Sequence, residues 1–390
     1  MNWQAIPLGI RRYIMFSVIG GVSFITVIIS PAWANLMHFS LVDVGWIFSV
    51  TFAIQAILSY ILGKRFENAS PNVALSIGRV SFALGNLLFA IATRLWIFVV
   101  AQLLFSFLDV LYPSLVMYER AILVPKYREK LYWLLFVVND LTKAVVYFSF
   151  VFLLSPKLSG IRFYQVIFVS VGVANLVYAL AFMKFLPRVE KGTQLHAEQV
   201  YRPAHRKIFF LLMLHQYLSY SSFGFASFLI ISYYLMNVFK LGAASPILFE
   251  ALFSVSVALS TLWRPKLRTP PHLNFVVGII CVTISLLLMC VFNVYIFFGA
   301  HLIMGVGFVL WFPAKEMLKM DMGPKELGRW EGFFQGLNIF TRIFTPVLST
   351  MVATGIGYVY DFFIAACLTF TSFLVAIPAI KWYGKSFYGK

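Results

Sequence analysis

Long apolar runs dominate the pattern of hydrophobic and polar positions along this chain. Most of them reach the roughly 20 residues that a helix needs to cross a bilayer. They lack the alternation of barrel strands, and an open sheet would leave backbone groups unpaired in lipid. The pattern therefore predicts an all-α polytopic membrane protein with twelve transmembrane helices, over residues 13–34, 42–62, 72–92, 96–118, 131–154, 162–186, 207–237, 244–263, 273–292, 294–314, 331–354 and 359–381.

One long hydrophilic stretch, residues 187–206, divides the chain near its middle. We interpret it as a cytoplasmic linker between two halves. Residues 1–186 then form an N-terminal six-helix bundle, and residues 207–390 form a C-terminal six-helix bundle.

Composition and charge placement support a membrane protein. The chain is 61% hydrophobic and 12% charged, with a mean hydropathy of +0.87, far more apolar than a soluble domain of this length. With the N-terminus placed in the cytoplasm, 25 of the 31 basic residues fall on inner loops and helix ends, four fall outside, and two remain in the membrane. This bias predicts cytoplasmic termini. It also accounts for the net charge of +17 without nucleic acid. We expect a multi-pass protein of the plasma membrane.

Nothing in the sequence indicates a metal, a cofactor or an enzyme. The three cysteines, Cys281, Cys290 and Cys367, fall inside apolar runs and are expected to act as small packing residues. A membrane-embedded enzyme would be expected to carry paired acidic motifs or clustered histidines. The sequence has no Asp-x-x-x-Asp or His-x-x-x-His motif.

The two intramembrane cations belong to a repeated motif. Asn139-Asp140-Leu141-Thr142-Lys143 and Asn338-Ile339-Phe340-Thr341-Arg342 both fit Asn-x-x-Thr followed by a cation, and they lie 199 residues apart. Each lies about a dozen residues inside an apolar run. A cation near the middle of a bilayer is costly and usually functional.

Other positions repeat with a similar offset of about 200 residues. Pro113 corresponds to Pro313, and Gly78 corresponds to Gly278. A parallel repeat of two six-helix units implies a pseudo-twofold axis along the membrane normal, with a site near the midplane.

The sequence resembles the major facilitator superfamily over essentially all 390 residues. The resemblance rests on twelve predicted spans, the central basic linker, the cytoplasmic termini and a degenerate loop signature at residues 63–67, where Lys64 replaces the usual aspartate. It implies a secondary transporter that works by alternating access. In that family helices 1, 4, 7 and 10 line the cavity, and helices 3, 6, 9 and 12 face lipid.

Within this frame the charges in mid-membrane avoid the lipid-facing helices. Asp109 belongs to helix 4, Asp140 and Lys143 to helix 5, Glu250 to helix 8 and Arg342 to helix 11. The cost of an unpaired charge in hydrocarbon favours this distribution.

Two related cations suit an anionic solute, because planar guanidinium groups favour carboxylate or phosphate. We therefore expect substrate contacts from Lys143, Arg342, Asn139 and Asn338, with Tyr217 and Tyr220 of helix 7 beside them. The alternative is a structural Arg342 that pairs with Glu250 or with backbone carbonyls.

Four titratable residues are candidates for proton coupling, namely Asp109, Asp140, Glu250 and His215. Asp140 and Lys143 are spaced i, i+3 and can pair on one helix face. That pair is either a structural lock between helices 4 and 5 or part of a titratable cluster. His215 is either a proton carrier or a packing residue.

The charges at the inner ends of helices 4 and 10 form a further candidate group. Glu119-Arg120 and Lys315-Glu316 occupy corresponding positions in the two halves. They predict either a cytoplasmic network that holds one gating state or a plain solvated interface.

The sequence as a whole predicts a monomeric secondary active transporter of a small organic solute, coupled to protons and without a cofactor. The alternatives are a drug or metabolite exporter with an aromatic cavity, a receptor on the same fold and a membrane enzyme. The solute, the direction of transport and the coupling ion are left open.

Overall fold

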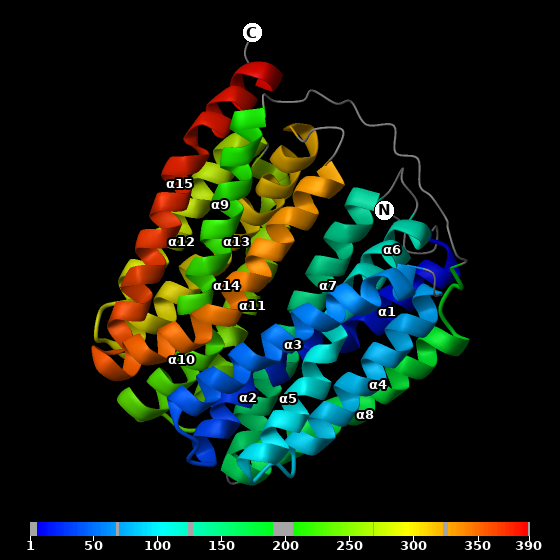
Figure 1. Ribbon diagram of the computed structural model, residues 1–390, viewed down its shortest axis with the longest axis vertical. Helices are drawn as coiled ribbons and strands as arrows, with labels where there is room; N and C mark the ends of the chain where they lie inside the picture. Colours follow the sequence, from blue (N-terminus) through cyan, green and yellow to red (C-terminus); the bar gives the residue numbers. More distant parts are fainter. Residues whose placement is uncertain are drawn as a thin grey trace. The chain divides into compact units, whose positions relative to one another are not determined.

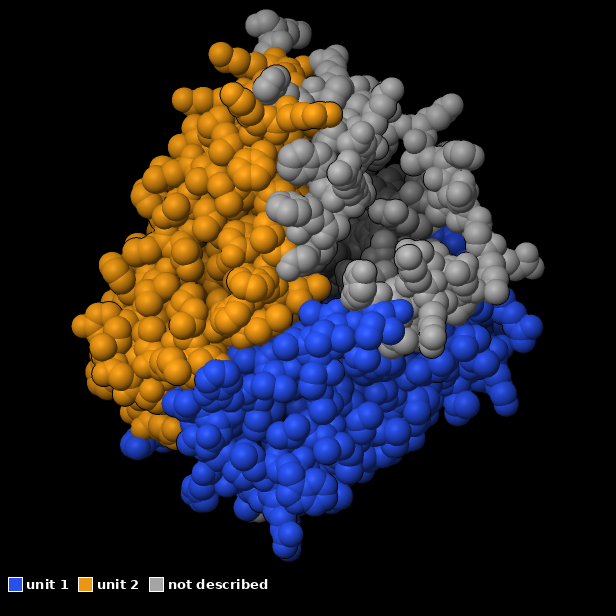
Figure 2. All heavy atoms as spheres, in the orientation of Figure 1, with its two compact units in different colours: residues 1–197, 240–248 blue, residues 198–239, 249–390 orange. Residues whose placement is uncertain are grey.

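A computed structural model shows a helical protein that divides into two compact units (Figures 1 and 2). The structure describes residues 6–67, 70–123, 128–158, 160–189, 206–267, 269–322 and 327–388, and within these ranges it contains no strand. The prediction of helices is confirmed. Unit 1 comprises residues 1–197 and 240–248, and unit 2 comprises residues 198–239 and 249–390. Residues 190–205, most of the predicted linker, lie outside the described residues.

The helices of unit 1 follow one another with short connections. They are α1 (Leu8–Ser23), α2 (Ile25–Leu36), α3 (Leu41–Glu67), α4 (Pro71–Phe89), α5 (Leu95–Val110), α6 (Tyr112–Ile122), α7 (Arg128–Ser149), a π-helical turn (Phe150–Leu154), a 3₁₀ turn (Ser155–Lys157) and α8 (Gly160–Lys184).

The helices of unit 2 are α9 (Arg206–Phe225), α10 (Phe228–Tyr233), a π-helical turn (Tyr234–Val238), α11 (Ser245–Leu267), α12 (Pro271–Met289), α13 (Val294–Met322), α14 (Leu327–Gly355) and α15 (Tyr358–Tyr388). In unit 2, one continuous helix, α13, corresponds to the pair α5 and α6 of unit 1. The first residues of α11 belong to unit 1.

The same helix pairs pack together in both units, which is the structural counterpart of the sequence repeat. In unit 1 α1 packs on α7 and α8, and α4 packs on α5 and α8. In unit 2 α9 packs on α14 and α15, and α12 packs on α13 and α15. Each unit therefore repeats one scheme of neighbours, in the order that the 200-residue offset predicts.

Within the described ranges, ten helical segments are long and apolar enough to cross a membrane. They are Leu8–Leu36, Leu41–Ser59, Pro71–Phe89, Val137–Lys157, Gly160–Lys184, Arg206–Val238, Ser245–Trp263, Pro271–Met289, Val294–Lys319 and Tyr358–Phe387. Leu95–Val110 is a shorter apolar helix, and α14 is not among the ten.

Three predicted spans are interrupted helices. The first breaks at Phe24, between α1 and α2. The span predicted over 96–118 breaks at Leu111, two residues before Pro113. Pro113 lies in the first turn of α6, where proline is tolerated, but in a continuous helix it would lack an N–H donor and its ring would clash with the carbonyl of the preceding turn. The span predicted over 207–237 breaks where Ser227 is extended (ψ 160°). In contrast, α3 continues to Glu67, so residues 63–67 are its last turn and the predicted loop is wrong.

Glycines allow helices to approach closely in both units. A Cβ atom on Gly85 of α4 would lie 2.6 Å from the backbone nitrogen of Phe105 in α5. A Cβ atom on Gly278 of α12 would lie 2.4 Å from the backbone nitrogen of Trp311 in α13. Such distances leave no room for any side chain, so these two crossings depend on glycine.

Candidate functional site

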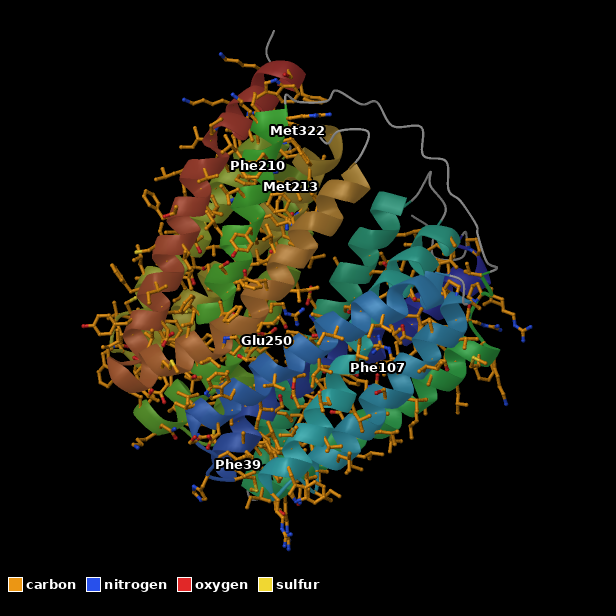
Figure 3. All side chains as sticks on the ribbon, viewed as in Figure 1. Phe39, Phe107, Phe210, Met213, Glu250 and Met322 are labelled. Carbon is orange, nitrogen blue, oxygen red and sulfur yellow. The ribbon has the colours of Figure 1, made fainter. Side chains whose placement is uncertain are left out.

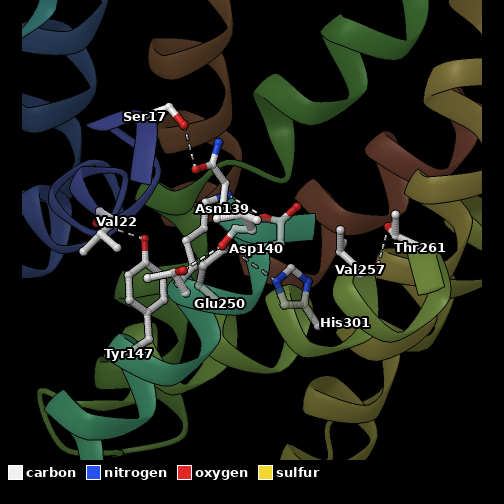
Figure 4. Close-up of polar contacts among 12 residues, drawn as sticks. Ser17, Val22, Asn139, Asp140, Tyr147, Glu250, Val257, Thr261 and His301 are labelled. Atoms are coloured by element: carbon white, nitrogen blue, oxygen red, sulfur yellow. Dashed lines mark hydrogen bonds and ion pairs between the residues drawn. The ribbon is translucent and has the colours of Figure 1, made fainter. Parts of the chain in front are cut away.

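One face of α7 carries three polar residues toward α1. Asn139, Lys143 and Tyr147 are spaced by four residues and therefore share a helix face. Asn139 Oδ1 lies 3.5 Å from the hydroxyl of Ser17, and the Tyr147 hydroxyl donates to the carbonyl of Val22 at 3.3 Å (Figure 4). Two of the predicted site residues, Asn139 and Lys143, thus lie together on one polar stripe inside unit 1.

The Lys143 ammonium group forms an ion pair with Asp140. Its Nζ atom lies 2.7 Å from Asp140 Oδ1, with the side chains 19% and 8% exposed. The same Nζ lies 5.5 Å from the ring centroid of Phe24, at the break between α1 and α2. The i, i+3 spacing had predicted this pair, and the structure forms it. Asp109 is exposed on α5.

The corresponding residues of α14 lie in a different environment. Arg342 is exposed at the middle of this 29-residue helix, whereas Asn338, one turn earlier, is buried and its Oδ1 atom lacks a hydrogen-bond partner. An arginine half-way along such a helix cannot face hydrocarbon at acceptable cost. Its exposed side is therefore expected to face water.

The tyrosines predicted on helix 7 differ in their surroundings. Tyr217 packs against the core of unit 2, and Tyr220 is 37% exposed. The Lys315 ammonium group lies 5.1 Å from the Tyr220 ring, 5.2 Å from Trp311 and 4.6 Å from Phe312. An ammonium group over aromatic faces is attracted by the ring quadrupoles.

Lys315 also belongs to the predicted network at the inner end of helix 10. Glu316 lies 3.0 Å from the Lys315 amine and 2.5 Å from that of Lys319. In unit 1, Glu119 accepts a hydrogen bond from the Tyr13 hydroxyl. The side chain of Arg120 lies outside the described part of the chain.

His215 is held at both ring nitrogens. Nδ1 lies 3.1 Å from the carbonyl oxygen of Ser372, and Nε2 lies 3.0 Å from the indole Nε1 of Trp311. A carbonyl can only accept and an indole N–H can only donate, so Nδ1 carries the proton and Nε2 is an acceptor. These contacts require the neutral ring and favour the structural alternative for His215.

Glu250 and His301 form a second acid–base pair, in unit 2. Glu250, labelled in Figure 3, lies on α11, and its Oε2 atom is 3.6 Å from Nε2 of His301 on α13 (Figure 4). Both side chains are at least 95% buried. Glu250 therefore contacts His301.

Sequence reasoning missed His301 and Trp311. His301 was visible only as a histidine inside an apolar run, and its partner lies on another helix. Local spacing gave no signal for Trp311 as the donor to His215. Among the residues that the structure describes, no group of three or more His, Cys, Asp or Glu side chains could hold a metal ion.

Comparison with known proteins gives likenesses of fold. No family model matches the sequence, and no curated protein is similar to it in sequence. The structure is similar to the human organic anion transporter MFSD10 (TM-score 0.66, 12% identity, 94% of this chain and 99% of that one). It is also similar to the nucleoside transporter NupG (0.67, 13%, 97% and 100%). A third likeness is to a bacterial homologue of the iron transporter ferroportin in its inward-facing state (0.67, 14%, 95% and 98%).

These likenesses extend over nearly the full length of each chain. All three neighbours are membrane transporters rather than enzymes. At such low identity the likeness is one of fold alone, and it agrees with the many apolar helices of a multi-pass membrane protein.

Proposed function

We propose that this chain, which has the fold of the major facilitator transporters, is a proton-coupled secondary active transporter of a small organic anion. Twelve helices in two six-helix bundles would cross the plasma membrane, with both termini in the cytoplasm. The protein would work as a monomer by alternating access.

Arg342 carries the proposal of an anionic solute. Its guanidinium group is exposed at the middle of α14, where a membrane-facing position is excluded by cost. A guanidinium group presents a planar fork of donors that matches a carboxylate or a phosphate. Asn338 lies one turn earlier but is buried, so the exposed guanidinium group by itself forms the candidate anion subsite.

Lys143 has a different part in this proposal. Because Asp140 already balances its charge at 2.7 Å, Lys143 can bind an anion only in exchange for that carboxylate. We assign the main solute contact to Arg342 because its side chain is exposed at mid-helix, and we keep Lys143, Asn139 and Tyr220 as secondary contacts. Tyr217 packs into the core and is the weakest candidate.

A thermal-shift screen tests the proposal. Purified protein is heated with organic anions, lipophilic cations, sugars and nucleosides at pH 5.5 and 7.5, because a ligand that binds only the folded state raises the melting temperature. We expect stabilisation by a class of anions that is lost in Arg342→Ala. Arg162→Ala is the matched control, since Arg162 is also exposed but lies in the first turn of α8.

Flux measurements complete the test. The stabilising anion should accumulate in proteoliposomes when a pH gradient is imposed. Stabilisation by lipophilic cations alone would contradict the anion site and favour the drug-exporter alternative. Equal loss of stabilisation in the Arg162 and Arg342 variants would show a general charge effect and remove Arg342 from the site.

A further inference from the structure

The acid–base pair of unit 2 is a poorly satisfied polar contact in the interior of that unit. Glu250 is 3% exposed and His301 is 4% exposed. Their closest atoms, Oε2 and Nε2, are 3.6 Å apart, slightly beyond hydrogen-bonding distance. Neither ring nitrogen of His301 has a hydrogen-bond partner. Buried polar atoms normally have a hydrogen-bond partner, so two unpartnered ring nitrogens need a physical explanation.

The surroundings of the pair are apolar. The His301 ring stacks on Phe249, with centroids 3.6 Å apart and an interplanar angle of 14°, and it lies 5.0 Å from the Phe253 ring. Phe297 and Phe298 also pack on Phe249, with ring centroids 5.1 Å and 5.7 Å away. Within unit 2, the polar group beside the edge of the His301 ring is the Glu250 carboxylate.

Several other charged or titratable groups of unit 2 lie on other helices or farther along α13. Lys315 and Glu316 follow His301 on α13 by about 14 residues, or about 21 Å at 1.5 Å per residue. Arg342 belongs to α14, and His215 of α9 is bound to Ser372 and Trp311. Asp361 of α15 is buried with both carboxyl oxygens unpartnered.

We propose that Glu250 and His301 form a proton-binding pair that takes up one proton between them. With a neutral ring and an ionised carboxylate, the pair carries one negative charge in an apolar pocket, which is costly. One proton from water gives either an imidazolium beside a carboxylate or a neutral ring beside a carboxylic acid. Both forms have zero net charge, and both place a donor hydrogen between Nε2 and Oε2, which the neutral ring beside an ionised carboxylate does only in its Nε2–H tautomer.

The pair of unit 1 shows the contrast. Lys143 and Asp140 are on one helix, 2.7 Å apart, and already share a charge-assisted hydrogen bond. That contact needs no further proton. We therefore move the proton site from Asp140 and Asp109 to Glu250, with His301 as its partner. The role of this site in coupling rests on the proposed function, but its proton binding does not.

A proton titration of four proteins tests the pair without any solute. The full-length wild type, Glu250→Gln, His301→Phe and the double variant are titrated in detergent between pH 9 and 4, and the protons bound per chain are counted. Subtracting the Glu250→Gln curve from that of the wild type gives the proton that depends on Glu250. The same subtraction in the His301→Phe background gives that proton without its partner.

We expect about one Glu250-dependent proton. The pH midpoint of its binding should differ by more than about one pH unit between the protein with His301 and the His301→Phe protein, since strongly coupled groups titrate as a unit. His215→Phe is the matched control, because that buried histidine has both nitrogens occupied, and it should leave the Glu250-dependent curve unchanged.

Two results would overturn the pair. Either the Glu250-dependent proton is absent, or its midpoint is the same with and without His301. If Glu250→Gln aggregates, Glu250→Leu replaces it, and the double variant Glu250→Leu/His301→Phe removes the buried polar pair as a whole, which is often tolerated. Failure of this titration leaves the transporter proposal standing, and failure of the solute screen leaves the proton count standing.

Discussion

Gly278→Ala is the sharpest test of the packing between α12 and α13. The added Cβ atom would lie 2.4 Å from the Trp311 backbone nitrogen, 2.7 Å from the Gly307 carbonyl oxygen and 2.7 Å from Trp311 Cβ. None of these atoms can move by a side-chain rotation. The two helices must separate by several tenths of an ångström or more, along a crossing that also positions the Trp311 indole against His215.

The magnitude follows from two opposed effects. Alanine gains about 1 kcal/mol over glycine inside a helix. Overpacking costs about 1–3 kcal/mol, and the upper end applies because main-chain atoms receive the clash. We expect a net loss of about 2 kcal/mol. For a unit of this size that corresponds to a fall in melting temperature of roughly 4–8 °C.

Gly299→Ala is the matched control, on α13 itself. A Cβ atom there meets nothing within 4 Å, so only the helix-propensity gain applies and stability should be unchanged or slightly higher. Both variants are compared with the wild type by the fraction of monodisperse protein that survives heating before size-exclusion chromatography. A Gly278→Ala protein as heat-resistant as Gly299→Ala would refute the close-contact reasoning.

Two further changes separate structural from functional charges. His215→Phe should lower stability by about 1–3 kcal/mol, because the Trp311 indole N–H loses its buried acceptor; a variant with wild-type melting temperature would show that the bond contributes nothing. Lys143→Met should destabilise more than the double variant Lys143→Met/Asp140→Asn, because the single change leaves a largely buried carboxylate alone. Equal melting temperatures for the single and double variants would indicate that water, rather than Lys143, solvates Asp140.

Local patterns predicted what depends on local geometry. The helices followed from apolar runs, and the pairing of Lys143 with Asp140 followed from spacing on one helix. The common scheme of helix neighbours followed from the 200-residue repeat. The break before Pro113 follows from proline sterics, although a span counted by hydropathy alone runs through it.

Contacts between distant helices were beyond such reasoning. Glu250 finds His301 on another helix, and His215 finds both Trp311 and Ser372. Each of these pairings requires the packing of whole helices, which the order of residues on any one helix does not encode. The two copies of the Asn-x-x-Thr motif also differ in the exposure of their cations. The Lys143 side chain is 19% exposed on α7, and Arg342 is exposed on α14.

The ion pair on α7 has a consequence for biosynthesis. On insertion scales a lone aspartate or lysine at a helix centre disfavours entry into the bilayer by about 2.5–3.5 kcal/mol. Because Asp140 and Lys143 lie one turn apart and bond at 2.7 Å, α7 carries its own counter-charge and needs no later helix to become insertable. Glu250 has no counter-charge on its own helix, because its partner His301 is synthesised later, on α13. The nascent α11 must therefore leave the translocon before the acid–base pair can form.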